Sequence, residues 1–187
     1  MPLHQISIYF KKAFFVLALA VSLLIHAPQQ SSAASPGEYQ IKAAMIFNMM
    51  RFVDWPDTTL SSNDETIDIC FVNRGAMSSA IESLRGKQVK GKVVVVRQAG
   101  RSGGFSGCNV LLLSDTDRQS ASAILDQTRS TPVMTVGDFR GFAAAGGIFG
   151  FIILEGKVRF EVNLTSAQRH RIRISSQLLK LAQTVLE

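Results

Sequence analysis

The polar residues best suited to binding a partner form a short cluster near the C-terminus. They are three arginines and one histidine: Arg169, His170, Arg171 and Arg173. Apolar residues at helical spacing predict a helix over residues 165–185, and the cluster falls in its first turns. The N-terminal end of a helix favours anions, so cations placed there need an acidic partner. Glu161 on the preceding segment, a small anion or an acidic surface of another protein would each serve.

Arg171 is the least expected residue of this cluster, because it interrupts the apolar stripe of the predicted helix. A solvated helix face is the alternative explanation for Arg169 and His170. Thr165 and Gln168 have the spacing of a capping box, which predicts where the helix begins. The candidate residues for contact with a partner or ligand are therefore Glu161, Arg169, Arg171 and Arg173.

Catalytic and metal-binding residue types are scarce beyond the first 34 residues. His170 is the one histidine there, and Cys70 and Cys108 are the two cysteines. A zinc site has almost no ligands to draw on, and nucleophilic catalysis would depend on His170 alone. Asp115 and Asp117 follow a predicted strand, where doubly wound folds keep their sites, but capping the next helix explains them as well. We expect no enzyme, cofactor or metal; a hydrolase that depends on His170 is the alternative.

The two cysteines predict a disulfide. An even cysteine count in an exported protein favours pairing, and a Cys70–Cys108 bridge closes a loop of nearly forty residues. In the chain-entropy model a loop of that length contributes about 4 kcal/mol. Two buried, reduced thiols are the alternative.

The first 34 residues have the pattern of a cleaved signal peptide. Lys11 and Lys12 precede the uncharged run 13–25, and small residues follow up to Ala34. The run is shorter than the ~20 residues of a membrane span, although an uncleaved anchor is the alternative. We expect cleavage after Ala33 or Ala34.

Composition indicates one folded domain over residues 35–187 and argues against nucleic acid as a partner. Hydrophobic residues make up 47% and charged residues 18% of the 187-residue chain, which is enough for one well-buried core. Removal of Lys11 and Lys12 with the leader lowers the formal charge from +6 to +4. Because no dense basic run with interleaved aromatic residues remains, we expect no nucleic-acid binding.

Strands alternate with helices along this domain. Predicted strands are residues 67–72, 93–96, 109–113, 132–136, 148–154 and 158–163. Predicted helices before the last one are residues 37–53, 76–84 and 118–129. The alternation predicts an α/β fold with a mainly parallel, doubly wound sheet of about six strands. A tight connection at residues 155–157 predicts a C-terminal antiparallel hairpin, which the closing C-terminal helix follows.

Two details of this fold can be stated from the sequence. The strand order 2-1-3-4, common in doubly wound sheets, places the third strand beside the first and so brings Cys70 and Cys108 together. The first helix has an apolar face through Ile41, Ala44, Met45 and Phe52 and ends before Pro56. Trp55 is expected to pack the end of this helix onto the sheet, with stacking on a ligand as the alternative.

Three segments together resemble the YfiR family of periplasmic proteins. They are IKAAMIFNMMRFVDWP at 41–56, VRFEVNL at 158–164 and ISSQLLKLA at 174–182. The pair of end motifs at this separation is fairly specific, whereas either motif alone is weak. The resemblance covers essentially the whole chain after the leader.

The resemblance implies a periplasmic, non-catalytic regulator. Such a protein binds and represses the periplasmic sensor domain of a membrane-bound diguanylate cyclase, which lowers cyclic di-GMP and biofilm formation. Redox change, or sequestration by an OmpA-like outer-membrane lipoprotein, releases the repression. Some members carry a second cysteine pair near residues 143–150, which this chain lacks, so a redox switch through that pair is not expected. A homodimer through apolar helix surface remains open.

A small-ligand-binding protein in the periplasm is the second hypothesis. Glu161, Arg171 and Arg173 would then hold an anion or a zwitterion through charge-assisted contacts.

Overall fold

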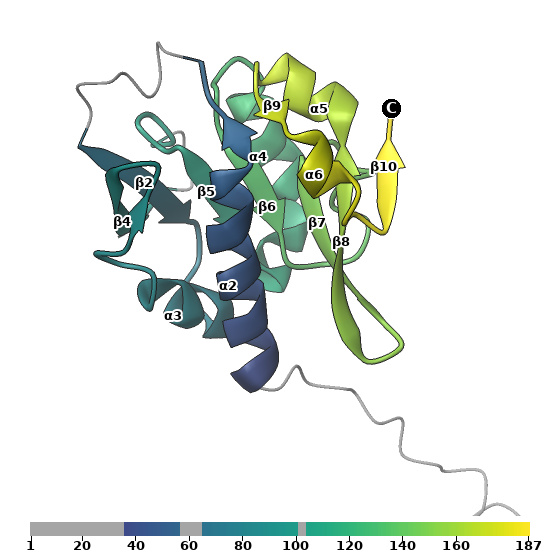
Figure 1. Ribbon diagram of the computed structural model, residues 1–187, viewed down its shortest axis with the longest axis horizontal. Helices are drawn as coiled ribbons and strands as arrows, with labels where there is room; N and C mark the ends of the chain where they lie inside the picture. Colours follow the sequence, from purple (N-terminus) through teal and green to yellow (C-terminus); the bar gives the residue numbers. More distant parts are fainter. Residues whose placement is uncertain (1–35, 57–64, 101–103) are drawn as a thin grey trace, which may run out of the picture. The chain divides into compact units, whose positions relative to one another are not determined.

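A mostly parallel sheet is the centre of the fold in the computed structural model, which describes residues 36–56, 65–100 and 104–187. Its strands are β2 (Thr66–Phe71), β3 (Gln88–Val89), β4 (Lys92–Gln98), β5 (Val110–Leu113), β6 (Met134–Gly137), β7 (Phe149–Leu154), β8 (Lys157–Asn163) and β10 (Thr184–Leu186). Within the described residues the strands lie in the order β10-β8-β7-β6-β5-β2-β4-β3 (Figure 1). Only β3–β4 and β7–β8 are antiparallel pairs among these neighbours. The doubly wound fold class is therefore confirmed, with the short strands β3 and β10 added at the edges.

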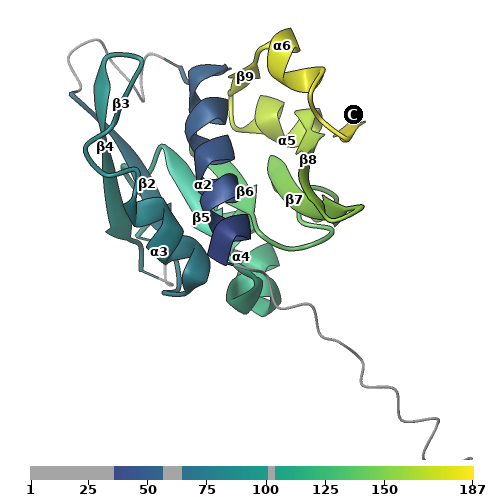
Figure 2. The same ribbon diagram turned by 60° about the horizontal axis from the view of Figure 1, so that its bottom comes forward.

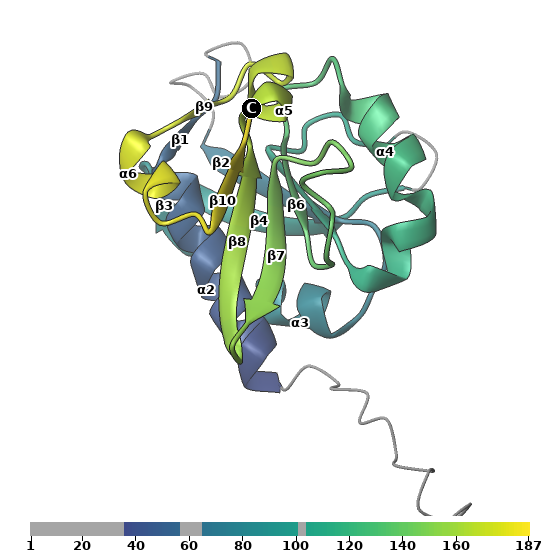
Figure 3. The same cartoon turned by 90° about the vertical axis from the view of Figure 1, so that its right-hand side faces the viewer.

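Helices cover both faces of the sheet. They are α2 (Pro36–Arg51), α3 (Ala76–Glu82), α4 (Ala121–Thr128), which follows the 3-10 helix η1 (Asp115–Ser120), α5 (Leu164–Arg169) and α6 (Ser176–Leu179). α2 and α3 pack together on one face (Figure 2), and α4 covers the other (Figure 3). Each face has its own apolar core, with Ile46 and Ile81 in one and Ile124 and Leu125 in the other.

The disulfide predicted from the strand order is present. β5 pairs with β2 in parallel, so Cys108 just before β5 lies beside Cys70 within β2. The two residues are bonded, with their Cα atoms 5.8 Å apart. Trp55 also lies as predicted: it is buried, and its Nε1–H donates to the Asn109 carbonyl at 3.0 Å, next to the start of β5.

The apolar face predicted for the first helix is only partly right, because Met45 and Phe52 pack against the core whereas Ile41 and Ala44 do not. Ile41 is 53% exposed, and Ala44 is exposed as well. The fully buried face of α2 instead passes through Ala43, Ile46, Met49 and Met50. Apolar residues therefore occur on two faces of this helix, and only one of these faces is fully buried. Lys42 lies on that buried face.

The single C-terminal helix predicted over residues 165–185 is replaced by two short helices and two short strands. α5 begins at Leu164 and its N-cap is Asn163, whose side chain accepts from the Ser166 N–H at 2.8 Å, so the capping box from Thr165 is wrong. After α5, β9 (Arg173–Ile174) pairs antiparallel with β1 (Val53–Asp54), and α6 and β10 follow. β10 then runs parallel to β8 at the edge of the sheet.

Arg171 marks the point where α5 ends. Its φ is 56°, in the left-handed region, and its N–H donates to the Gln168 carbonyl at 2.9 Å. The Ile172 N–H donates to the Ala167 carbonyl at 2.9 Å, and both of these side chains are buried. This is a Schellman motif, which normally has glycine at the position of Arg171. The interruption of the apolar stripe was therefore a helix-termination signal.

The predicted leader, residues 1–34, lies outside the described residues. Among the residues that are described, no helix is both long and apolar enough to span a membrane.

Candidate functional site

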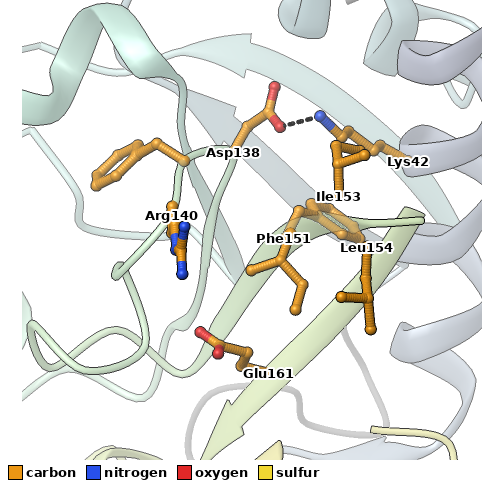
Figure 4. Close-up of a pocket in the computed structure, with 9 residues that line it drawn as sticks. Lys42, Asp138, Arg140, Phe151, Ile153, Leu154 and Glu161 are labelled. Carbon is orange, nitrogen blue, oxygen red and sulfur yellow. Dashed lines mark hydrogen bonds and ion pairs between the residues drawn. The ribbon is translucent and has the colours of Figure 1, made fainter. Parts of the chain in front are cut away.

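A pocket of about 440 Å³ opens where β7 continues past the end of β6. β6 ends at Gly137 and pairs with β7 only at Phe149 and Gly150, so the rest of β7 leaves the sheet as one arm of the β7–β8 hairpin. The pocket is lined by Lys42, Asp138, Phe139, Arg140, Phe151, Ile152, Ile153, Leu154 and Glu161 (Figure 4). It lies at the carboxyl end of a parallel strand, which is where doubly wound folds place their sites.

A buried charged cluster forms one wall of this pocket. The Lys42 Nζ donates to Glu38 Oε1 and to Asp138 Oδ1, each at 2.5 Å. The side chains of Lys42, Asp138 and Glu38 are 6%, 7% and 19% exposed. Glu38 and Lys42 are one helical turn apart on α2, and Asp138 directly follows β6, so the cluster ties α2 to the carboxyl end of the sheet.

Burial and pairing act against each other in this cluster. Burial raises the pKa of the Asp138 carboxyl above its usual value; the bond from Lys42 opposes the shift, and the charges of Glu38 and Asp115 add to it. Burial on its own lowers the pKa of Lys42, but Asp138 and Glu38 outweigh it and the pKa is raised. Lys42 thus stays charged at neutral pH, while Asp138 takes up a proton more readily than an exposed aspartate.

Glu161 is the one predicted site residue that lines the pocket. It is half-buried on β8, and its side chain makes no hydrogen bond or ion pair with any residue that the structure describes. Figure 4 shows its carboxylate directed toward the side of the pocket on which Arg140 lies. Arg140 is exposed. The pocket therefore offers an available acceptor and an available donor beside the apolar side chains of β7.

The three predicted arginines lie elsewhere. Arg169 at the end of α5, Arg171 in the connection and Arg173 at the start of β9 are exposed, and none of them lines the pocket. Arg173 is opposite Asp54 in the β1–β9 pair. A hydrogen bond from Lys90, and then the charges of Lys90 and Arg173, lower the pKa of Asp54. The acid near Arg173 is thus Asp54 and not Glu161.

The left-handed backbone at Arg171 gives a stability prediction. Glycine adopts this conformation without the ~1 kcal/mol penalty of other residues, so Arg171→Gly is expected to raise the free energy of unfolding by about that amount. Arg169→Gly, two residues earlier in α5, should lower it. Urea denaturation of both variants provides the measurement. A destabilised Arg171→Gly protein would contradict the assignment of the helix end.

His170 is buried, with Nδ1 2.7 Å from the Thr131 carbonyl oxygen, to which it donates. Burial lowers the pKa of this imidazole, the bond to Thr131 opposes the shift and the charge of Arg169 adds to it. The ring therefore holds the α5 turn against the chain before β6, and the interpretation of His170 as a solvated residue is wrong.

This histidine predicts a pH dependence of stability. Because its pKa is lower in the folded than in the unfolded state, its stabilising effect is complete above the ordinary value of 6.5 and is lost as the pH falls through the folded pKa. The free energy of unfolding should thus decrease as pH falls below 6.5, and the decrease should be smaller in His170→Gln. Parallel pH profiles of the two proteins would contradict this role.

Lys42, Asp138 and Arg140 are pocket residues that the sequence did not single out. Lys42 had a detectable signal, since a lysine four residues before Ile46 and seven before Met49 shares a helix face with them. Asp138 and Arg140 follow a predicted strand but have no distinctive spacing. Asp117, by contrast, behaves as a helix cap: its Oδ2 accepts from the Ser114 N–H at 2.7 Å.

Metal-ligand clusters of three or more His, Cys, Asp or Glu do not occur in the described ranges. The pocket and the exposed arginines are candidate binding regions of this part of the chain.

Comparison with known proteins identifies the fold and the family. A conserved domain protein from Vibrio cholerae O1 biovar El Tor str. N16961 aligns with 79% of the chain at 14% identity and a TM-score of 0.48. The ABC domain in complex with L-Trp from Streptococcus pneumoniae aligns with 80% of the chain at 12% identity and a TM-score of 0.51, which shows a shared fold alone. The chain spans 60% of the length of each. No curated protein sequence matches significantly. The YfiR/HmsC-like family model matches residues 39–183, so the chain belongs to the YfiR/HmsC-like family.

Proposed function

We propose that this protein is a periplasmic, non-catalytic repressor of an inner-membrane diguanylate cyclase. The family match over residues 39–183 carries the proposal, because membership supports a periplasmic regulator in cyclic di-GMP signalling. The protein would bind the periplasmic sensor domain of the cyclase, and all chemistry would take place in the partner. Export through a cleaved leader, residues 1–34, brings the two proteins into the same compartment.

Deletion of the gene tests this function. Cyclic di-GMP and biofilm formation are expected to rise in the deletion strain, and the rise should disappear when the cyclase gene is also deleted. Unchanged cyclic di-GMP in both backgrounds would refute the proposal.

The exposed arginines can be examined in the same strains. A triple variant with Arg169, Arg171 and Arg173 changed to glutamate should fail to restore repression if they contact the cyclase. Lys180→Glu, an exposed charge reversal on the C-terminal cap of α6, is the matched control.

Two further partners belong to the proposal. An OmpA-like outer-membrane lipoprotein would sequester the repressor and release the cyclase. A homodimer would use exposed apolar surface such as Leu181, which is 68% exposed. Copurification with the lipoprotein and analytical ultracentrifugation examine the two separately.

A periplasmic small-ligand binder is the second candidate, favoured by the opposite charges of Glu161 and Arg140 at one pocket. A zwitterion would place its ammonium at Glu161 and its carboxylate at Arg140. Thermal-shift screening distinguishes this function, since a ligand at 100 times its Kd adds about 2.7 kcal/mol of stability.

A further inference from the structure

The pocket beside Asp138 follows the edge of a strand. Four consecutive residues of β7, Phe151 to Leu154, line it. Side chains of neighbouring residues in a strand point to opposite faces, so what these four share is the backbone edge of β7. The facing wall is also a run of consecutive residues, 138–140. The pocket is therefore a slot between a strand edge and the bend that follows β6.

This edge of β7 has no partner strand among the described residues. All six residues of β7 pair with β8 on one side, but only Phe149 and Gly150 pair with β6 on the other. An open edge presents backbone N–H and C=O groups that an extended segment of another chain can bind. Figure 3 shows the β7–β8 hairpin extending past the end of β6.

Apolar side chains continue from the slot onto the neighbouring surface. Ile153 and Leu154 of the hairpin are 50% and 42% exposed, and Ile41 of α2 is 53% exposed. Ile41 and Ile153 also line a second pocket of about 480 Å³ between the start of α2 and the hairpin. Because Ile153 belongs to both pockets, the slot and this patch form one continuous surface.

The Glu161 carboxylate favours a basic side chain at the slot. The slot is lined by two carboxylates, Asp138 and Glu161, and by two cations, Lys42 and Arg140; Glu38 lines the second pocket, as does Lys157. Lys42 is already bonded to Glu38 and Asp138, whereas Glu161 has no partner within the described part of the chain. A lysine or arginine reaching Glu161 would satisfy this carboxylate.

We propose that the slot binds an extended segment of a partner protein, which adds as a strand to the free edge of β7 and places a basic side chain at Glu161. The apolar residues of the segment, which alternate with the basic ones, pack against Ile153 on the opposite face of β7 from Glu161. The proposal holds whether or not a diguanylate cyclase is the partner, so it can fail without affecting the proposed function.

Synthetic peptides test this site on the full chain. The probe is an acetylated and amidated pentapeptide of alternating valine and lysine, and its binding is followed by fluorescence anisotropy. Glu161→Gln is expected to weaken binding of the peptide about tenfold, because the lysine of the peptide loses its charge-assisted contact with the carboxylate. Glu155→Gln, the same change in the exposed hairpin turn, is the matched control and should bind like the wild type. Equal weakening by both variants would overturn the site.

Backbone pairing is tested without changing the protein. A strand edge bonds every second residue of an added strand, so one of two probes N-methylated at alternate amides should lose binding and the other should keep it. Equal effects of the two methylation patterns would refute strand addition. A valine–glutamate probe that binds as tightly as the valine–lysine probe would overturn the proposal. Free norleucine that competes as well as the unlabelled peptide would also overturn it, because the site would then bind a small zwitterion.

Discussion

Replacement of Lys42 by methionine is expected to lower the free energy of unfolding at pH 7 by about 3–5 kcal/mol, the cost of leaving a buried charge without its partner. The lysine side chain is 6% exposed and bonds two carboxylates at 2.5 Å. Without it, Asp138, which is 7% exposed, must remain charged beside Glu38 or bind a proton. Lys180→Met, a change at an exposed lysine, should stay within about 0.5 kcal/mol of the wild type.

The Lys42→Met defect should shrink as the pH falls from 7 toward 5. Burial raises the pKa of Asp138 already in the wild type, so its neutral form is favoured by folding. The stability linked to a raised pKa is complete below the ordinary value of 3.8 and is lost as pH rises through the folded pKa. The bond from Lys42 is the main interaction that opposes the rise in the pKa of Asp138. Without Lys42 this pKa should rise further, and the pH dependence of stability should become larger. Urea denaturation at the two pH values measures it, and a defect below about 1 kcal/mol at pH 7 would contradict a buried ion cluster.

The sheet could be predicted from the sequence because its signals are local. The apolar runs at 67–72 and 109–113 match the strands β2 and β5, and the β-branched run at 93–96 matches β4, in which Val94 and Val96 are buried and Val93 is exposed. Short connections then limit the strand order, and that order places Cys70 beside Cys108. In β2, β4 and β5 the local sequence preference for a strand agrees with the structure that the tertiary contacts require.

The last 23 residues could not be predicted because tertiary contacts decide their structure. Apolar spacing from Leu164 to Val185 fits one helix, but β1 and β8 offer edges that pair with β9 and β10. Pairing of these edges and the left-handed Arg171 outweigh helix propensity.

The pocket was missed for a related reason. It is formed by residues distant in sequence, with Lys42 on α2, Asp138 after β6 and Glu161 on β8. Only Glu161 was singled out from the sequence, and the partner expected for it, Arg171, belongs to another region. Hydrophobic periodicity in the sequence assigns each residue to a helix or a strand. It does not show that β7 continues past the end of β6, which is what opens the pocket.

The disulfide predicts the second large effect. Cys70 and Cys108 are 38 residues apart, and a bridge over that distance removes about 4 kcal/mol of unfolded-state entropy in the chain-entropy model. Both residues are fully buried in the core under α4, so their replacement also removes packed sulfur atoms. The double variant Cys70→Ala, Cys108→Ala is therefore expected to lose at least as much stability as reduction alone.

Urea denaturation with and without a phosphine reductant separates the bridge from the packing. Reduction should lower the free energy of unfolding of the wild type by about 4 kcal/mol and leave the double variant unchanged. The remaining difference between the reduced wild type and the double variant then measures the packing of the two thiols. Because the bridge joins β2 to β5 at the centre of the sheet, reduction should loosen the sheet before it affects the hairpin and the pocket. Equal stability of the oxidised and reduced wild type would refute the stabilising role of the bridge.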